Sequence, residues 1–183
     1  MQQAVDHLRA VQAPARVAGL LTTMGMVALG QDAYGHAERL EVEALEAIRE
    51  LDDPYTLGLV RGNTGLAALL GGRLDAADAA FRGQLAIAGE HRYVGFTFEG
   101  LLGLAALAGA QHADERAAVL EAAAWAINDR PPYASEIPVY NRVTDTFIGP
   151  ARARLDAEAC ERAATAGRAL SADDAIALAL ASP

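Results

Sequence analysis

Apolar residues recur at helical spacing along almost the whole chain. β-Branched and aromatic residues are sparse, whereas Ala and Leu dominate, so the pattern predicts an all-α protein with no sheet. Turn-forming or polar clusters interrupt it at residues 12–14, 30–32, 52–54, 71–72, 90–92, 109–113 and 128–133. The segments between these clusters predict helices of about 15 to 18 residues joined by short turns, which is the usual connection between antiparallel neighbours.

The chain repeats itself with a period of 40 residues. Two sets of small residues carry this period, namely Gly25, Gly65 and Ala105, and then Ala37, Ala77 and Ala117. A fixed period of this size indicates a solenoid, whose units stack because no unit can bury its apolar face alone. The period predicts one domain over residues 1–183 with about nine to ten helices. We expect hairpin units at 15–53, 54–91 and 92–129, followed by C-terminal helices over 134–181.

The spacing of these residues resembles the tetratricopeptide (TPR) pattern, in which a Leu-Gly pair in one helix is followed by Ala and an aromatic residue in the next. Small residues suit the point where the two helices of a hairpin cross most closely. The resemblance implies a TPR-like right-handed superhelix of antiparallel hairpins, with roughly one extra turn in each helix because the common period is about 34. Phe81 provides the aromatic residue in the second unit, but Glu41 and Glu121 take its position in the first and third. Residues 2–11 are expected to be the second helix of a preceding hairpin.

Charge narrows the functions that the chain can perform. Fifteen basic residues, all of them Arg, stand against 24 acidic residues, which gives a formal net charge of −9 and a pI near 4.8. Such a surface repels a phosphate backbone, so direct nucleic-acid binding is not expected. The N-terminal segment lacks the apolar centre of a signal peptide, and no stretch reaches the roughly 18 apolar residues of a membrane span. We therefore expect a cytoplasmic protein that does not contact a membrane.

Three motifs lie in the last third of the chain. They are R-A-A-V-L-E-A-A at 116–123, R-P-P at 130–132 followed by Y-N-R at 140–142, and G-R-A-L-S-A-D-D-A-I-A-L-A at 167–179. This arrangement resembles the C-terminal region of large ATPase-containing bacterial transcriptional regulators, the LuxR/MalT-like group and related winged-helix regulators. The resemblance implies a TPR-like sensor region that shares its polypeptide with an ATPase domain and a DNA-binding domain. This chain itself has no Lys for a G-x-x-x-x-G-K-[ST] loop and no basic recognition helix.

One segment departs from the family pattern. Residues 131–150 are richer in β-branched and aromatic side chains than the Ala-rich counterpart, which predicts a stretch that is irregular at first and then helical.

The residue types that carry chemistry are dispersed. The four histidines, His7, His36, His91 and His112, lie too far apart for ligand spacing, so neither a metal nor another cofactor is expected. Helix capping explains the acids at 52–53 and those that follow Ser171. The single Cys160 excludes an internal disulfide, and a lone thiol in an Ala-rich helical stretch is more often a packing residue than a nucleophile. No nucleophile, base and orienting group come together, so an enzyme is not expected.

A solenoid leaves one inner surface, built mainly from its first helices, where peptides or helices bind. Positions offset from the packing residues predict which side chains line it. They are Thr22, Met26, Asn63, Leu66, Glu99 and Leu102, with Arg61 and Arg92 as a cationic rim. The expected occupant is a protein, a peptide or a small effector.

The sequence therefore favours a non-catalytic binding domain that serves as the sensor or interaction region of a larger transcriptional regulator. Two alternatives remain open. One is a free-standing scaffold or oligomerisation module, such as a homodimer formed through exposed apolar faces. The other is a small-molecule-binding helical domain.

Overall fold

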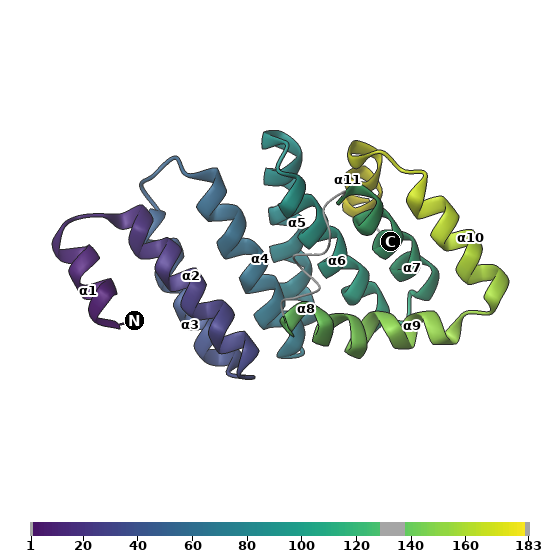
Figure 1. Ribbon diagram of the computed structural model, residues 1–183, viewed down its shortest axis with the longest axis horizontal. Helices are drawn as coiled ribbons and strands as arrows, with labels where there is room; N and C mark the ends of the chain where they lie inside the picture. The colour runs from purple at the N-terminus through teal and green to yellow at the C-terminus, as the bar shows by residue number, and fades with distance from the viewer. Residues whose placement is uncertain (1, 129–137, 182–183) are drawn as a thin grey trace.

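The computed structural model describes residues 2–128 and 138–181, and this part of the chain is helical apart from its turns (Figure 1). The helices are α1 (Gln2–Ala10), α2 (Pro14–Gly30), α3 (Tyr34–Ile48), α4 (Pro54–Leu70), α5 (Leu74–His91), α6 (Val94–Ala110), α7 (Asp114–Ile127), α8 (Pro138–Val143), α9 (Gly149–Arg154), α10 (Ala157–Arg168) and α11 (Ala172–Leu180). The π-helical turn η2 (Thr144–Ile148) joins α8 to α9, so residues 138–154 form one continuous helix. The predicted all-α architecture is confirmed.

Three helical hairpins, α2/α3, α4/α5 and α6/α7, stack side by side along the long axis of the molecule (Figure 1). Successive hairpins contact each other through α3 and α4 and through α5 and α6, and the first helices α2, α4 and α6 also touch in turn. α4 begins after Asp53, whose carboxylate accepts the backbone N–H of Thr56 at 2.9 Å. The predicted helix start at Asp52-Asp53-Pro54 is therefore confirmed, with Pro54 as the first helical residue.

The turn inside each hairpin is the same, and it recurs every 40 residues. Its central residue adopts a left-handed conformation, with φ of 60° at Asp32, 77° at Gly72 and 61° at His112. The next backbone N–H bonds to the carbonyl five residues back, over 2.9 Å from Ala33 to Ala28, 2.8 Å from Arg73 to Ala68 and 2.9 Å from Ala113 to Ala108. These bonds satisfy carbonyls that a helix end leaves free. The period in the sequence is thus a repeat of the backbone.

Phe81 ties two hairpins together. A Cβ on Gly65 of α4 or on Gly103 of α6 would lie 2.5 or 2.4 Å from the Phe81 ring, so both glycines are needed to admit it. The ring is 1% exposed. The small residue and the aromatic residue predicted for the second unit therefore meet at the helix crossing, and Gly103 of the next hairpin contacts the same ring.

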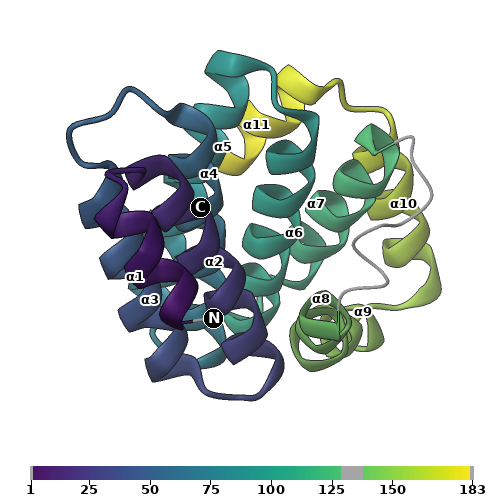
Figure 2. The ribbon, with the colours of Figure 1, turned by 60° about the vertical axis from the view of Figure 1, so that its left-hand side comes forward.

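The helix over residues 138–154 departs from the hairpin pattern and runs across the stack. It crosses the lower ends of α6 and α7 in Figure 1, and Figure 2 shows it nearly along its axis beside α6. α8 contacts α2, η2 contacts α6 and α7, and α9 contacts α7. Pro150 explains the π-helical turn, because its ring would clash with the carbonyl four residues back in a regular α-helix. The N–H of Gly149 bonds instead to the carbonyl of Thr144.

The sequence predicted that 131–150 would become helical, and the helix begins at Pro138. The predicted irregular start and the R-P-P motif at 130–132 fall within residues 129–137, which lie outside the described part of the chain.

The last two helices close the molecule. α10 packs on α7, and α11 packs on α5, α6 and α7. Arg82 Nη1 donates to the carbonyl of Leu180 at 2.7 Å and Arg116 Nη2 donates to that of Ala179 at 3.0 Å, so two guanidiniums satisfy the C-terminal end of α11. Ser171 caps its N-terminus, as predicted. α6 is strongly apolar, contacts α4, α5, α7, α11 and the helix over 138–154, and is buried along most of its length.

None of the described helices combines the length and the apolar composition needed to cross a membrane.

Candidate ligand-binding pocket

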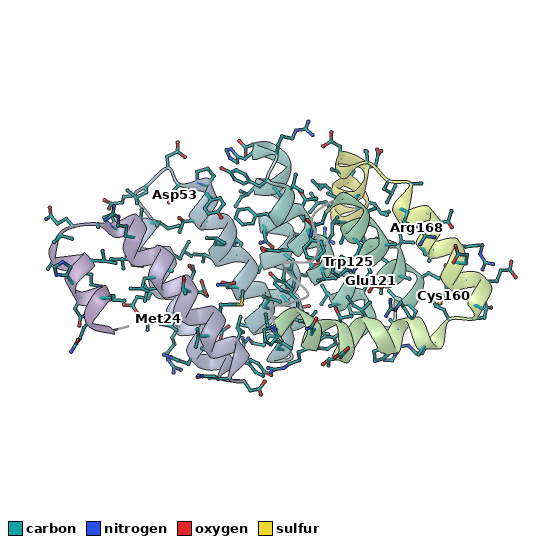
Figure 3. The ribbon with its side chains drawn as sticks, viewed as in Figure 1. Met24, Asp53, Glu121, Trp125, Cys160 and Arg168 are labelled. Carbon is teal, nitrogen blue, oxygen red and sulfur yellow. The ribbon has the colours of Figure 1, made fainter. Side chains whose placement is uncertain are left out.

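A pocket of about 640 Å³ lies between α7, α9 and α10. Four of its nine lining residues are alanines, and the remainder provide one indole ring, a thiol and three charged side chains. The lining residues are Ala118, Glu121, Ala122, Trp125, Ala126, Arg152, Cys160, Ala164 and Arg168. Figure 3 labels Glu121 and Trp125 on α7 and Cys160 and Arg168 on α10, the two helices that flank the pocket. Both the volume and the lining are typical of a small-molecule site.

Small residues set the spacing between α7 and α10. A Cβ on Gly167 would lie 2.3 Å from the carbonyl oxygen of Val119 and 2.7 Å from the Cβ of Ala122, so the two helices touch there. Ala159 and Ala163 are buried in the same interface. Because alanine side chains end at Cβ, the part of the interface that also faces α9 is left unfilled, and this space is the pocket.

Trp125 forms one wall. Its ring packs edge-to-face on Phe98 of α6, with the ring centroids 5.0 Å apart and the planes at 67°. Phe98 is 2% exposed, whereas Trp125 is 39% exposed. One edge of the indole is therefore fixed by the core while the remainder faces the pocket, so a ligand meets a pre-positioned aromatic surface.

Glu121 and Arg152 form an ion pair at the pocket, with Arg152 Nη1 3.2 Å from Glu121 Oε2. The Glu121 side chain is 9% exposed and that of Arg152 is 51% exposed. Burial raises the pKa of Glu121 above its ordinary value, and the charge of Arg152 opposes this rise. The glutamate thus lies in the wall, and the guanidinium lies at the opening.

Arg168 and Cys160 complete the polar lining. Arg168 Nη2 is 3.1 Å from Glu161, and both of these side chains are more than half exposed. The Cys160 thiol donates to the carbonyl oxygen of Arg152 at 3.4 Å. No His, Lys or second carboxylate lines the pocket to act as a base on this thiol, and no group of three His, Cys, Asp or Glu converges as a metal site in the described residues. The polar part of the lining thus consists of one carboxylate, two guanidiniums and one thiol.

Glu121 occupies the repeat position of Phe81. Residues 41, 81 and 121 are 40 apart, and their exposed fractions are 1%, 1% and 7%. Each glutamate finds a polar partner outside its own hairpin, which is Asn63 Nδ2 for Glu41, at 2.9 Å, and Arg152 for Glu121. The two glutamates that depart from the TPR-like pattern are thus buried and polar-bonded in place of an aromatic ring.

The residues predicted to line an inner groove do not form an open surface. Thr22, Asn63, Leu66 and Leu102 are buried, Met26 and Glu99 are partly buried, and Arg61 and Arg92 are exposed. Asn63 of α4 is bonded to both helices of the first hairpin, since its Nδ2 donates to Glu41 of α3 and also to the carbonyl of Thr22 of α2 at 3.0 Å. Most of the predicted face is therefore interior, and Arg92 is paired with Asp173 at 2.5 Å.

The chain's own helix over 138–154 accounts for part of this burial. Tyr140 is buried and hydrogen-bonds with Glu99, which also accepts from Gln84 Nε2 at 2.9 Å. Burial raises the pKa of Glu99 to about 7, against the opposing effect of these hydrogen bonds. Arg142 Nη1 donates to the carbonyl of Leu29 at 3.2 Å and also bonds the Asp32 carboxylate.

Sequence reasoning missed the pocket residues. Trp125 lies on α7, the last helix of the third hairpin, whereas Arg152 and Arg168 lie on α9 and α10, which do not follow the 40-residue period. Two signals were present in the sequence: a lone Trp on an Ala-rich helix, and arginines on the helices that follow. Neither signal says that these helices pack together.

Comparison with known proteins gives no relative: no family model, no curated protein and no solved structure matches this chain. Function is therefore inferred from the residues and contacts of the chain itself.

Proposed function

We propose that this chain is a non-catalytic, ligand-binding helical-repeat domain, and that the pocket between α7, α9 and α10 receives a small molecule. The observation that supports this most directly is the pocket itself, about 640 Å³ in volume, which is lined by four alanines, one positioned indole, a thiol and three charged side chains. Peptide binding on the inner face is less well supported, because the helix over 138–154 already packs against that side.

In a sensor, ligand binding must change the structure elsewhere in the molecule, and the helix over 138–154 connects the pocket to the first hairpin. Arg152 lines the pocket near one end of this helix, whereas Arg142 bonds to α2 near the other end. A ligand that shifts Arg152 would act on a helix whose far end touches the first hairpin. Such a shift requires the ligand to bind one arrangement of this helix better than another.

Filling the pocket tests the proposal. Ala164→Leu adds a larger side chain to the lining, and Ala166→Leu adds the same side chain at an exposed position of the same helix. Trp125 is the only Trp in the chain, so its emission reports on this site. We expect ligands from a library of small molecules with apolar bodies to shift this emission in the wild type and in Ala166→Leu but not in Ala164→Leu.

Two outcomes would contradict the proposal. One is a library in which no compound shifts the emission of Trp125 in the wild type. The other is a ligand whose affinity is the same in Ala164→Leu as in the wild type.

The resemblance of the last third of the chain to large regulators supports a wider proposal, that this domain is the sensor region of a transcriptional regulator. The test is to read the coding sequence on both sides of the segment. An in-frame ATPase domain and a helix-turn-helix domain would support the proposal. Stop and start codons at the two ends would contradict it and leave a free-standing binding domain.

Self-association is a second candidate function, and the outer face of α3 favours it. Val42 is 66% exposed and Leu45 is 41% exposed, one turn apart on this helix. Light scattering after gel filtration should show a dimer whose fraction rises with concentration, and V42E together with L45E should abolish it. V94E, at a similarly exposed position on α6, is the control. A wild-type monomer at all concentrations would exclude this candidate.

A further inference from the structure

We infer that the ligand of the pocket between α7, α9 and α10 is an organic anion, with an apolar or aromatic body that carries one carboxylate or a similar acidic group. This inference rests on the proposed function and goes further, because it assigns the chemical class of the ligand.

The charge of the lining is the first reason. Apart from the thiol, the ionisable side chains are Glu121, Arg152 and Arg168, so two positive charges face one negative charge. The whole chain carries a formal net charge of −9. An excess of positive charge among the lining side chains of a strongly acidic protein favours an anion in this pocket.

Both arginines are available to a ligand. Their side chains are 51% exposed at Arg152 and 56% exposed at Arg168. The partner of Arg168, Glu161, is itself 75% exposed, so this pair is weak and a ligand carboxylate can replace it. A guanidinium has five N–H donors, and Arg152 can therefore keep its contact with Glu121 while it donates to a ligand.

Glu121 does not cancel the two arginines. Its buried position disfavours the ionised form, although Arg152 partly offsets this. Any fraction of protonated Glu121 increases the positive excess of the lining. The carboxylate also lies deeper than the guanidiniums, with 9% of its side chain exposed, so an entering ligand meets the arginines first.

The apolar part of the lining specifies the body of the ligand. Trp125 presents a fixed aromatic surface, and Ala118, Ala122, Ala126 and Ala164 add methyl groups around it. A flat or aliphatic group of modest size would bury against this wall. An indole face also attracts cations, so an amine paired with Glu121 is the competing occupant. The two arginines repel a protonated amine and attract a carboxylate, so the lining favours an anionic ligand over a cationic one.

Three probes that share one body separate these possibilities. They are 4-phenylbutyrate, the neutral 4-phenylbutanamide and the cationic 4-phenylbutylamine. Each probe is titrated into the protein while Trp125 emission is measured, with excitation at a wavelength longer than the phenyl ring absorbs. We expect the carboxylate to bind at least tenfold more tightly than the amide, and the amine to bind more weakly than the amide. R152Q and R168Q should each weaken carboxylate binding by tenfold or more without changing the affinity for the amide. R162Q is the matched control, since Arg162 lies on α10, pairs with Glu158 and does not line the pocket.

The outcomes separate this inference from the proposed function. If the amide or the amine binds as tightly as the carboxylate, and Ala164→Leu abolishes that binding, then the pocket is a ligand site but the anion inference is overturned. The inference is also overturned if R152Q and R168Q both leave carboxylate binding within twofold of the wild type. If none of the three probes produces a signal that Ala164→Leu removes, the anion inference fails, and the library screen then decides the proposed function separately. Circular dichroism of each variant confirms that it is folded.

Discussion

At the residue scale, a buried glutamate replaces a buried phenylalanine at two of three equivalent positions. Phe81 is held by glycines from two hairpins, whereas Glu41 and Glu121 each have one polar partner. A Cβ on Gly25 would lie 2.1 Å from Glu41 Oε1, so the same small residue makes room for the carboxylate as for the ring. Glu41 Oε2 has no hydrogen-bond partner. A half-satisfied carboxylate is costly to ionise, and its charge state therefore affects stability.

Stability is expected to fall as the pH rises because of Glu41. Burial raises the pKa of this group from 4.5 to about 8, and the Asn63 hydrogen bond only partly opposes the rise. The native state therefore keeps a proton that the unfolded chain loses near pH 4.5, so the contribution is full below that pH and is lost towards pH 8. The slope is at most about 1.4 kcal/mol per pH unit. Urea unfolding from pH 5 to 8 should show this fall in the wild type and a shallower one in E41Q.

The matched control for this experiment is E46Q, on the same helix with a side chain that is 64% exposed. It should keep the wild-type dependence on pH. Equal slopes in E41Q and the wild type would show that Glu41 does not retain its proton.

The affinity of the pocket for an anion is expected to rise as the pH falls. Burial raises the pKa of Glu121, and its protonation leaves Arg152 and Arg168 without a compensating charge in the lining. Full protonation should tighten binding by about tenfold, given one charge removed within several ångströms at a partly exposed site. A phenylalkyl sulfonate stays ionised over the whole pH range, so any change of its Kd with pH, measured by Trp125 emission, comes from the protein and not from the ligand. E121Q should bind the sulfonate tightly at every pH. A wild-type Kd that does not change with pH would contradict the role given to Glu121 in anion binding.

The sequence alone could identify these residues but not their roles. The 40-residue period placed Glu41 and Glu121 where an aromatic belongs, and this departure was the visible signal. Their partners, Asn63 and Arg152, come from a later hairpin and from a helix outside the repeat. A period relates equivalent positions, and it contains no information on contacts between positions that are not equivalent.

At the element scale, the fit between hairpins depends on glycine at two crossings. G103A should cost about 1–3 kcal/mol of unfolding free energy, because the new Cβ would lie 2.4 Å from the Phe81 ring. G19A is the control, since its Cβ would meet nothing within 4 Å, and alanine should stabilise this helix by about 0.5–1 kcal/mol. Urea unfolding measures both changes. Adding F81L to G103A should recover part of the loss, and full additivity of the two substitutions would contradict a direct clash.

Helix positions were predictable where they follow local rules. The three left-handed turn residues at 32, 72 and 112 lie within the clusters that marked turns, and the cap at Ser171 follows from the acids after it. The course of the helix over 138–154 was not predictable. Its β-branched and aromatic residues set it apart from the Ala-rich pattern and predicted a helix after an irregular start. The helix packs across α2, α6 and α7, and such contacts depend on the whole stack.

At the scale of the whole molecule, the helix over 138–154 connects distant parts of the chain. Tyr140 and Val143 belong to the same core cluster as Leu66 and Leu102 of α4 and α6. The other end of the helix supplies Arg152 to the pocket. One helix thus covers part of the predicted inner face and also provides a lining residue of the pocket.

Ligand binding in the pocket is therefore expected to slow amide exchange along the whole of this helix, including residues 138–143, which lie far from the ligand. The reason is that an anion held by Arg152 restrains α9, and the continuous helix transmits this restraint through η2 to the contact of α8 with α2. Hydrogen–deuterium exchange with and without 4-phenylbutyrate measures the effect. R142A removes the guanidinium that bonds Leu29 and Asp32, so it should reduce the added protection at 138–143 while leaving ligand affinity unchanged. If the added protection from exchange is confined to α7, α9 and α10, the pocket binds its ligand without affecting the rest of the stack, and the predicted transmission along this helix is wrong.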